Sequence, residues 1–343
     1  MNWLTDQNAR PARTPDYRIS LQGQIITPRF RGRVESLRLT DRRGLEADQL
    51  DLVLTDDDGA LALPPRGAEL TLAIGWGGEA LVERGTFIVD EVEHSGAPDR
   101  LSIRARSADM RGSLPGKRTQ SWHKLTVGDI VTTIAKRHVL APKVGRNLAG
   151  IRIQHIDQTD ESDLNFLTRL AERYDAVATV KAGNLLFIPA GTATTSSGLE
   201  IPPVQIRRGD GDQHRYVVSD RDSYTGVIAY WNDASGAKRQ EVIAGSGDNA
   251  KRLRPTYASA DDALAAAQAE WQRIQRGHAE FSLTLAEGQP GLYPETPAWL
   301  IGWKREIEET PWIITEVTHD LSGSAYTNGL QFEIRNSDAQ APY

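Results

Sequence analysis

Residues 107–189 constrain the fold most strongly, because two helical patterns lie there with strand-like sequence on both sides. Thr126 is followed three residues later by Asp129, a pair that can cap the free N–H groups at a helix start. Apolar side chains then recur on one helical face, at Ile130, Val131, Ile134 and Ala135. The sequence therefore predicts an amphipathic helix that begins at Thr126 and buries one face.

A second helix is predicted with Asp160 as its N-cap and Asp163 three residues later. Its apolar stripe consists of Leu164, Leu167, Leu170, Ala171 and Tyr174. After this stripe the period changes to that of strands, over 176–180 and 185–188, with a turn between them. We expect two helices packed against a hairpin.

Short β segments with turn signals between them precede this unit. Apolar and polar residues alternate over 17–21, 34–39, 50–54, 70–74, 85–89 and 101–105. Turns are indicated at 57–59, 64–67 and 77–78, where Asp, Pro and Gly gather. Several short strands at this spacing favour a barrel or a sandwich.

A second β region follows a loop of small residues at 190–198, whose composition is typical of a flexible connector. This region starts at Val204, and its strongest strand covers 224–231. A third helix is predicted between Ser259, which pairs with Asp262 as a cap, and Gly277. Four more strands are expected, at 279–286, 298–303, 312–319 and 329–335.

These patterns predict a mainly β chain with a smaller α/β part. A length of 343 residues suggests two or three domains at roughly 150 residues each. We expect an N-terminal arm at 1–16 and a first β-barrel-like domain at 17–112. An α/β unit of two helices and a hairpin should follow at 113–200, and a second β-barrel-like domain with one helix at 201–343.

Composition excludes several classes of function. The chain has no cysteine, which rules out disulfides, thiolate metal sites and cysteine nucleophiles. Its formal net charge of −6 argues against a general nucleic-acid binder. No apolar run approaches the roughly 20 residues of a membrane span, and the N-terminus does not resemble a secretory signal. We expect a chain made in the cytoplasm, without stable membrane insertion.

The sequence predicts no catalytic, cofactor or metal site. The acidic residues Asp157, Asp160, Glu161 and Asp163 could be a cation site, but helix capping explains their spacing better. Acidic turns at 56–59 and 210–212 lack the spacing of a calcium loop. The histidines are scattered without a zinc-hydrolase motif, at His94, His123, His138, His155, His214, His278 and His319.

The tryptophans are interpreted by their setting. Those in the predicted strands are expected to pack in the core, namely Trp231, Trp299, Trp303 and Trp312. Trp3 lies in the polar arm, where an aromatic side chain is a candidate for docking on a partner.

Several segments carry a resemblance to a known family. These are SLRLTDRRGLEADQLDLVLTD, GTFIVDEVEHSGAPDRLSIRARSADM, GSLPGKRTQSW, TVGDIV, HIDQTDESDLNFLTRLAERYDAVATVK, GNLLF and WIITEVTHDLSGSAYTNGLQFEIR. Together they cover nearly the whole chain, and they resemble the late control protein D family of contractile-tailed bacteriophages and phage-tail-like bacteriocins.

The resemblance implies a structural baseplate hub with no defining catalytic motif. It implies a homotrimer in which two barrels per chain make a pseudo-sixfold ring around an axial channel, joining the tail tube to the central spike. Other baseplate proteins are implied partners, with the tape-measure protein as a further candidate. The alternatives are a tail-associated peptidoglycan-degrading enzyme and a carbohydrate-binding β protein.

Overall fold

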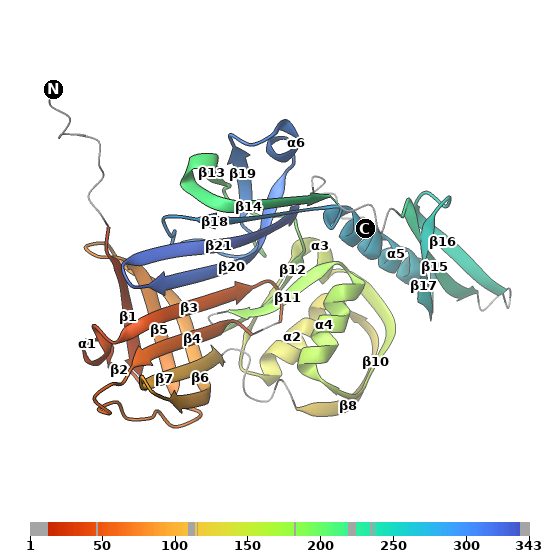
Figure 1. Cartoon of the computed structure of the whole chain (residues 1–343). Coiled ribbons are helices and arrows are strands. Elements are labelled where there is room, and N and C mark those ends of the chain that lie inside the picture. Colours follow the sequence, from red (N-terminus) through yellow and green to blue (C-terminus); the bar gives the residue numbers. More distant parts are fainter. Residues whose placement is uncertain are drawn as a thin grey trace.

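The computed structural model describes residues 13–45, 47–108, 114, 116–181, 183–218, 224–233, 236 and 238–336. The protein is mainly β with a smaller α/β part, which confirms the predicted fold class. Figure 1 shows four parts, which we call the first β unit, the α/β unit, the second β unit and the extension. The second β unit lies above the α/β unit in this view, and the extension projects to the right.

The first β unit contains the strands predicted near the N-terminus. In β4, Leu50, Leu52 and Leu54 are buried, while the residues between them are partly exposed. This alternation lays one apolar face on the core, as a half-buried strand requires. The elements are β1 (Pro15–Leu21), β2 (Gln24–Ile25), α1 (Thr27–Phe30), β3 (Val34–Arg42), β4 (Gln49–Thr55), β5 (Glu69–Trp76), β6 (Val82–Ser95) and β7 (Arg100–Ser107).

The α/β unit buries the apolar faces of two helices. Trp122 and Phe166 stack with their ring centroids 5.8 Å apart, and both side chains are buried in the same core cluster. The predicted hairpin is confirmed, with Val180 paired to Leu185. The elements are β8 (Lys117–Thr126), α2 (Val127–Arg137), β9 (Ala141–Val144), α3 (Arg146–Ala149), β10 (Arg152–Ser162), α4 (Asp163–Arg173), β11 (Ala176–Lys181) and β12 (Asn184–Pro189).

The second β unit has its own core, in which Phe281 lies among aromatic neighbours that include Trp312 and Phe332. The four strands predicted for the C-terminal part are confirmed. The elements are β13 (Val204–Arg207), the 3-10 helix η2 (Arg208–Asp210), β14 (Gly211–Val218), β18 (Ala279–Leu285), β19 (Pro297–Ile301), α6 (Arg305–Glu308), β20 (Trp312–Ser322) and β21 (Ala325–Ile334).

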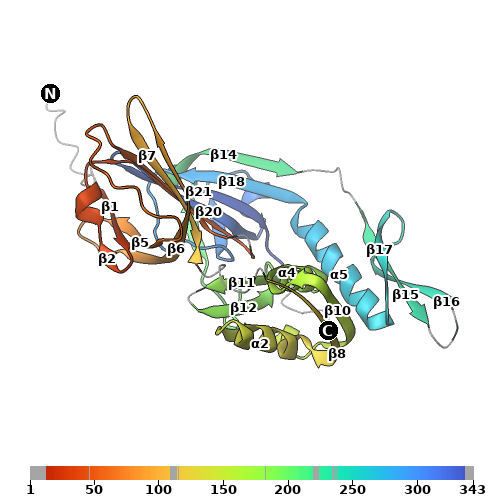
Figure 2. The ribbon, with the colours of Figure 1, turned by 90° about the horizontal axis from the view of Figure 1, so that it is seen from below.

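The extension is a small sheet with one helix on its face. Figure 2 shows that this helix leads from the sheet back to β18. The sheet's apolar side, with Val227 and Ala229, packs on the alanine-rich helix face at Ala263 and Ala267. The strand predicted at 224–231 is confirmed, and it lies in this separate sheet. The elements are β15 (Gly226–Asp233), β16 (Lys238–Gly245), β17 (Ala250–Tyr257) and α5 (Ala260–Arg276).

One strand pair fuses the two β units. Residues 36–42 of β3 pair antiparallel with 316–322 of β20, and we call this ladder the seam. It makes both units part of one 13-stranded sheet. The core of the first β unit also receives Leu321 and Tyr326 from the β20–β21 hairpin. The two units are therefore joined by backbone hydrogen bonds and by shared apolar packing.

The helix starts were predicted well in two cases and wrongly in one. Thr126 accepts a hydrogen bond from the Asp129 N–H, and Ser259 accepts one from the Asp262 N–H, as expected. The second helix is capped by Ser162, which accepts from the Asn165 N–H at 3.1 Å. The prediction of Asp160 as this cap is wrong, because β10 continues to Ser162.

The predicted flexible connector at 190–198 is also different in the structure. Ala193 is fully buried, and the Gly191 N–H donates to the Glu295 carboxylate at 3.1 Å. Thr194 forms an isolated β-bridge with Glu200. Small side chains permit close packing of residues 190–193 on the second β unit, so this half of the segment is not a loose connector, whereas Thr195, Ser197 and Gly198 are exposed.

The corrected cap gives a testable difference between two residues. Ser162→Ala should lower the free energy of unfolding by about 1 kcal/mol, because the Asn165 N–H loses its acceptor. Asp160→Asn is the matched control, since Asp160 is exposed and not the cap. Urea unfolding of both variants measures the difference, and equal destabilisation would contradict the assignment of Ser162 as the cap.

Candidate assembly surfaces and ion clusters

Five charged residues meet where the four parts of the molecule converge. Arg276, at the end of α5, donates to both carboxylate oxygens of Asp175, which follows α4. Its Nε donates to Glu333 of β21 at 2.9 Å. Arg43, directly after β3, pairs with Glu295 and Glu333. We call these five residues the central ion cluster.

The central ion cluster is buried and carries more acid than base. The Arg276 side chain is 4% exposed and that of Asp175 is 6% exposed. Three carboxylates face two guanidinium groups, and burial raises the pKa of Glu295 against the lowering effect of Arg43. Removal of one member of a buried ion pair leaves an uncompensated charge, which is strongly destabilising. This cluster therefore fixes how the four parts sit together.

A second cluster links the first β unit to its neighbours. Lys181 of β11 donates to Asp41 at 2.8 Å and also to Asp48. Arg84 of β6 donates to Asp41 at 3.0 Å and to the carbonyl of Leu292 at 3.2 Å. Burial, followed by the nearby Asp41 carboxylate, raises the pKa of Asp48 to about 6. Like-charged neighbours in a buried site hold protons more tightly.

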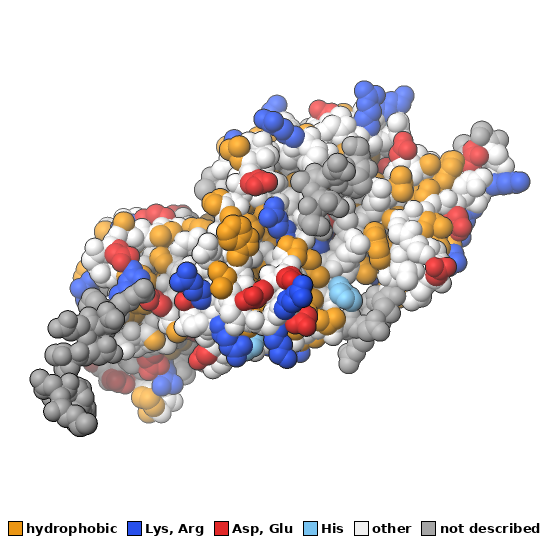
Figure 3. All heavy atoms as spheres, turned by 90° about the horizontal axis from the view of Figure 1, so that it is seen from above, with side chains coloured by type: hydrophobic (Ala, Val, Ile, Leu, Met, Phe, Trp, Pro, Cys, Tyr) orange, Lys and Arg blue, Asp and Glu red, His pale blue; other side chains and the backbone are white. Residues whose placement is uncertain are grey.

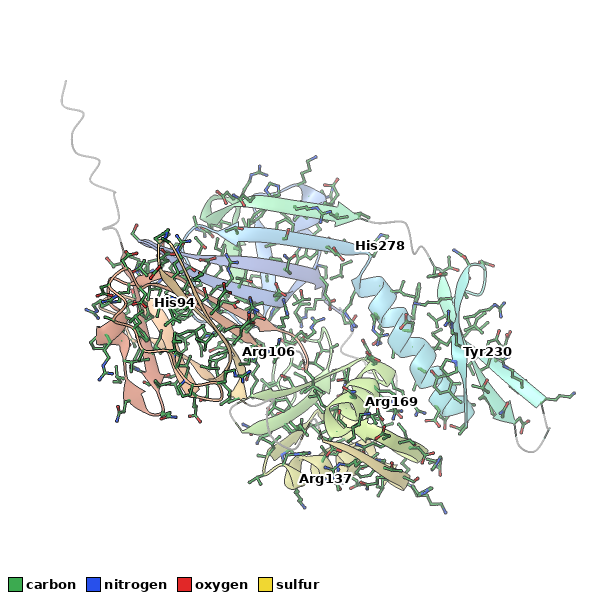
Figure 4. All side chains as sticks on the ribbon, turned by 60° about the horizontal axis from the view of Figure 1, so that its bottom comes forward. His94, Arg106, Arg137, Arg169, Tyr230 and His278 are labelled. Atoms are coloured by element: carbon green, nitrogen blue, oxygen red, sulfur yellow. The ribbon has the colours of Figure 1, made fainter. Side chains whose placement is uncertain are left out.

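The acidic residues considered as a cation site have separate partners. Asp157 accepts from Ser121, and Asp160 pairs with Lys117. Glu161 pairs with Arg169, a residue labelled in Figure 4. Asp163 is fully buried, and its carboxylate forms hydrogen bonds with side chains of the same unit, including Arg137, His138 and Gln158.

The other sequence candidates serve local structure. Asp58 pairs with Arg33, and Asp56 accepts from the Leu61 N–H at 3.0 Å, so this acidic stretch shapes a turn. Asp210 accepts from the Arg207 N–H at the start of η2. Within the described ranges, no group of three or more His, Cys, Asp or Glu side chains is arranged to hold a metal ion.

The tryptophans divide between core and surface. Trp312 is buried and Trp303 is 8% exposed, but Trp299 on β19 is 57% exposed. The prediction that Trp299 packs in the core is therefore wrong. Ile301 is 41% exposed two residues further along the same strand, so both side chains share one face of β19. Trp3 lies outside the described residues.

Hydrophobic side chains reach solvent on the upper side of the molecule. Figure 3 shows them lying between Lys, Arg, Asp and Glu side chains on this side, where Figure 1 places β13, β19 and α6. An exposed aromatic on a strand is a common anchor of protein interfaces. The face of β19 that carries Trp299 and Ile301 is thus a candidate assembly surface, and we call it the β19 face.

The extension presents a basic and aromatic surface. Tyr230, labelled in Figure 4, has the guanidinium of Arg239 over its ring at 3.7 Å from the centroid. Its hydroxyl accepts from Arg252 on the neighbouring strand. Because Val227 and Ala229 pack on the helix, Tyr230 lies on the opposite face of β15. This face is a second candidate assembly surface.

No helix among the described residues is both long and apolar enough to cross a membrane.

Comparisons with known proteins agree with the observed fold. Residues 42–325 match the family described as phage tail baseplate hub (GPD). The chain belongs to the phage tail baseplate hub family. A probable baseplate hub protein of Escherichia phage 186 is 46% identical over 367 aligned positions, which cover 95% of this chain and 94% of that protein. This chain is therefore a structural component of the tail baseplate of the virion.

Solved structures share the fold at low identity. The 43 kDa tail protein of prophage MuSo2 from Shewanella oneidensis has a TM-score of 0.68 and 17% identity, and the match covers 94% of this chain and 98% of that one. The c3393 protein of E. coli, a component of the type VI secretion system, has a TM-score of 0.56 and 14% identity over 94% of this chain and 80% of its own. These likenesses show that the fold shared with these proteins extends over nearly the whole chain.

The central ion cluster makes a prediction about stability. Arg276→Met should lower the free energy of unfolding by about 3–5 kcal/mol, because Asp175 keeps its buried charge without a partner and Glu333 keeps only Arg43. Arg305→Met is the matched control, since that arginine is 83% exposed and pairs only at the surface. Urea unfolding followed by tryptophan fluorescence measures both, and an Arg276→Met protein as stable as the control would contradict the role of the cluster.

Asp48 gives a pH dependence with a defined sign. Its pKa rises from the ordinary value of 3.8 to about 6 in the folded chain, so folding favours the protonated form. This contribution to stability is complete below about pH 4 and is lost as the pH rises through about 6. As the pH rises from 4.5 to 7.5, the free energy of unfolding of Asp48→Asn should therefore increase by about 1–3 kcal/mol relative to that of the wild type.

The measurement is urea unfolding of Asp48→Asn at the two pH values. Asp57→Asn serves as the control, because Asp57 is exposed in a turn of the same β unit. A stability difference between wild type and Asp48→Asn that does not change with pH would contradict the assignment.

Proposed function

We propose that three copies of this hub protein form a ring around an axial channel, with the two β units of each chain as successive members of a pseudo-sixfold arrangement. The observation that carries this proposal is the pair of β units in one chain. Among the described residues, the first has six long strands and the two-residue β2, and the second has six strands. Three chains would supply six such units.

The expected division into domains also follows from the two β units of the chain. We propose residues 17–112 and 201–343 as the two barrel-like domains, 113–200 as the α/β unit between them, and 1–16 as an arm that contacts a partner. Sheet closure between neighbouring copies would protect strand edges that have no neighbour among the described residues, such as those of β14 and β2. Head-to-tail contacts of this kind close into a ring when the rotation between copies permits it.

The proposed ring would join structures of different symmetry. Its sixfold side would match a hexameric tail tube, and its threefold side would bind the central spike. Other baseplate proteins and the tape-measure protein are further proposed partners. The family has a structural role in the baseplate, and we infer that this chain acts by assembly, without catalytic, cofactor or metal residues needed for that role.

The first test is the mass of the purified chain in solution. Light scattering should give about three chains, either for the protein alone or after mixing with the spike protein of the same gene cluster. A chain that stays monomeric alone, with the spike and with the tube protein would contradict the proposal. The same samples should show no hydrolysis of peptidoglycan, and hydrolysis lost on substitution of a carboxylate pair would overturn the non-enzymatic inference.

The β19 face offers a variant that separates assembly from folding. Trp299→Arg should weaken association by about tenfold or more, because an exposed aromatic anchor is lost. Leu63→Arg is the matched control, since Leu63 is 58% exposed in a loop of the first β unit. Equal association of both variants would show that the β19 face is not part of the proposed interface. The ring itself is tested separately, by the mass measurement.

A further inference from the structure

Two histidines face each other across the sheet formed by β8 and β10. His123 pairs with His155 in the antiparallel register. The Nδ1 atoms lie 3.0 Å apart, and the two rings stack with centroids 4.5 Å apart. Their sequence neighbours Trp122 and Ile156 point the other way and are buried. The histidine pair therefore lies on the solvent side of this sheet, where an ion can reach it.

A carboxylate behind one ring fixes its orientation. The Nε2 atom of His155 lies 3.0 Å from an oxygen of Asp157, whose other oxygen accepts from the Ser121 hydroxyl at 2.6 Å. Asp157 is thus held between the Ser121 hydroxyl and the His155 ring, with one carboxylate oxygen on each. It favours the tautomer of His155 with the proton on Nε2, which leaves the Nδ1 lone pair directed at His123.

This arrangement matches the way proteins prepare histidine for a metal. Histidine ligands commonly donate their second ring N–H to a carboxylate, which orients the ring and raises its basicity. Here Ser121, Asp157 and His155 form such a series. In the absence of a metal, a proton on Nδ1 of His123 can bridge the two rings.

We propose that His123 and His155 bind a divalent transition-metal ion through their Nδ1 atoms, with Cu²⁺ and Ni²⁺ favoured. Imidazole nitrogen suits these ions. With metal–nitrogen bonds of about 2.0–2.1 Å, a nitrogen separation near 3 Å corresponds to an angle of roughly 95° at the metal. Adjacent positions of a square-planar or octahedral site need about this angle, whereas a tetrahedral zinc site needs a wider one.

Water would complete the coordination, and Asp157 would remain behind His155. The consequence for the protein is local. β8 and β10 form a two-stranded sheet whose inner face, with Trp122 and Ile156, packs on the core of the α/β unit. A metal that bridges opposite residues would clamp the two strands together. The site does not depend on the number of chains in the assembly.

The test uses the untagged full-length chain with Cu²⁺ as the probe. Titration calorimetry at pH 7 should give one saturable site per chain that depends on both histidines. Electron paramagnetic resonance should show two coordinated nitrogen atoms from the site. His123→Ala and His155→Ala should each weaken binding by about tenfold or more, and Asp157→Asn by about 10–100-fold.

The control variant is His278→Ala, because that residue is exposed in the turn between α5 and β18 and is labelled in Figure 4. It should bind Cu²⁺ as the wild type does. Ni²⁺ should raise the unfolding temperature of the wild type and of His278→Ala, but not that of His155→Ala. Absence of saturable binding, a resonance signal without two nitrogen ligands, or unchanged affinity in His123→Ala and His155→Ala would each overturn the proposal.

Discussion

The seam between β3 and β20 is the constraint on which the rest of the structure depends. A seven-residue antiparallel ladder joins two β units that would otherwise be separate. At one end, the Arg43 N–H continues the ladder by donating to the carbonyl of Thr315 at 3.1 Å, and the Arg43 side chain enters the central ion cluster. The backbone hydrogen bonds of the seam and the buried charges beside it therefore hold the two β units together at the same place.

The interior of the joint also contains polar groups with defined partners. His319 lies opposite Leu39 in the seam and is fully buried. Its Nδ1 accepts a hydrogen bond from Asn328 at 2.8 Å, and burial lowers the pKa of His319 to about 2. A neutral imidazole held in this way adds geometric specificity to an otherwise apolar contact. The joint thus resists sliding of one β unit against the other.

Local features of the fold could be predicted from the sequence because local chemistry determines them. Thr126 with Asp129 marks a helix start, and the alternation around Leu52 marks a half-buried strand. The same capping pattern predicted Asp160 as the N-cap of the second helix instead of Ser162. Both residues are good N-caps, and they lie only two positions apart. The end of β10 decides between them. Pairing with β8, which is set by tertiary structure, determines that end.

Long-range contacts carry no comparable signal in one sequence. Arg43 and Glu333 are 290 positions apart, and neither has a neighbouring motif that indicates a buried partner. The exposure of Trp299 was missed for a related reason, because strand periodicity does not say which face a neighbouring chain will cover. The histidine pair was likewise invisible, since register brings together His123 and His155 from strands 32 positions apart. The family resemblance supplied the function, which local patterns did not.

We propose that the seam holds the two β units at an angle that lets three chains complete a ring. An electron-microscopic reconstruction of the assembled chain, alone or in complex with its spike protein, tests this claim most directly. We expect six β units around one axis with threefold symmetry, two from each chain and joined at β3 and β20. A twofold dimer, or a ring in which only one β unit of each chain surrounds the axis, would contradict it.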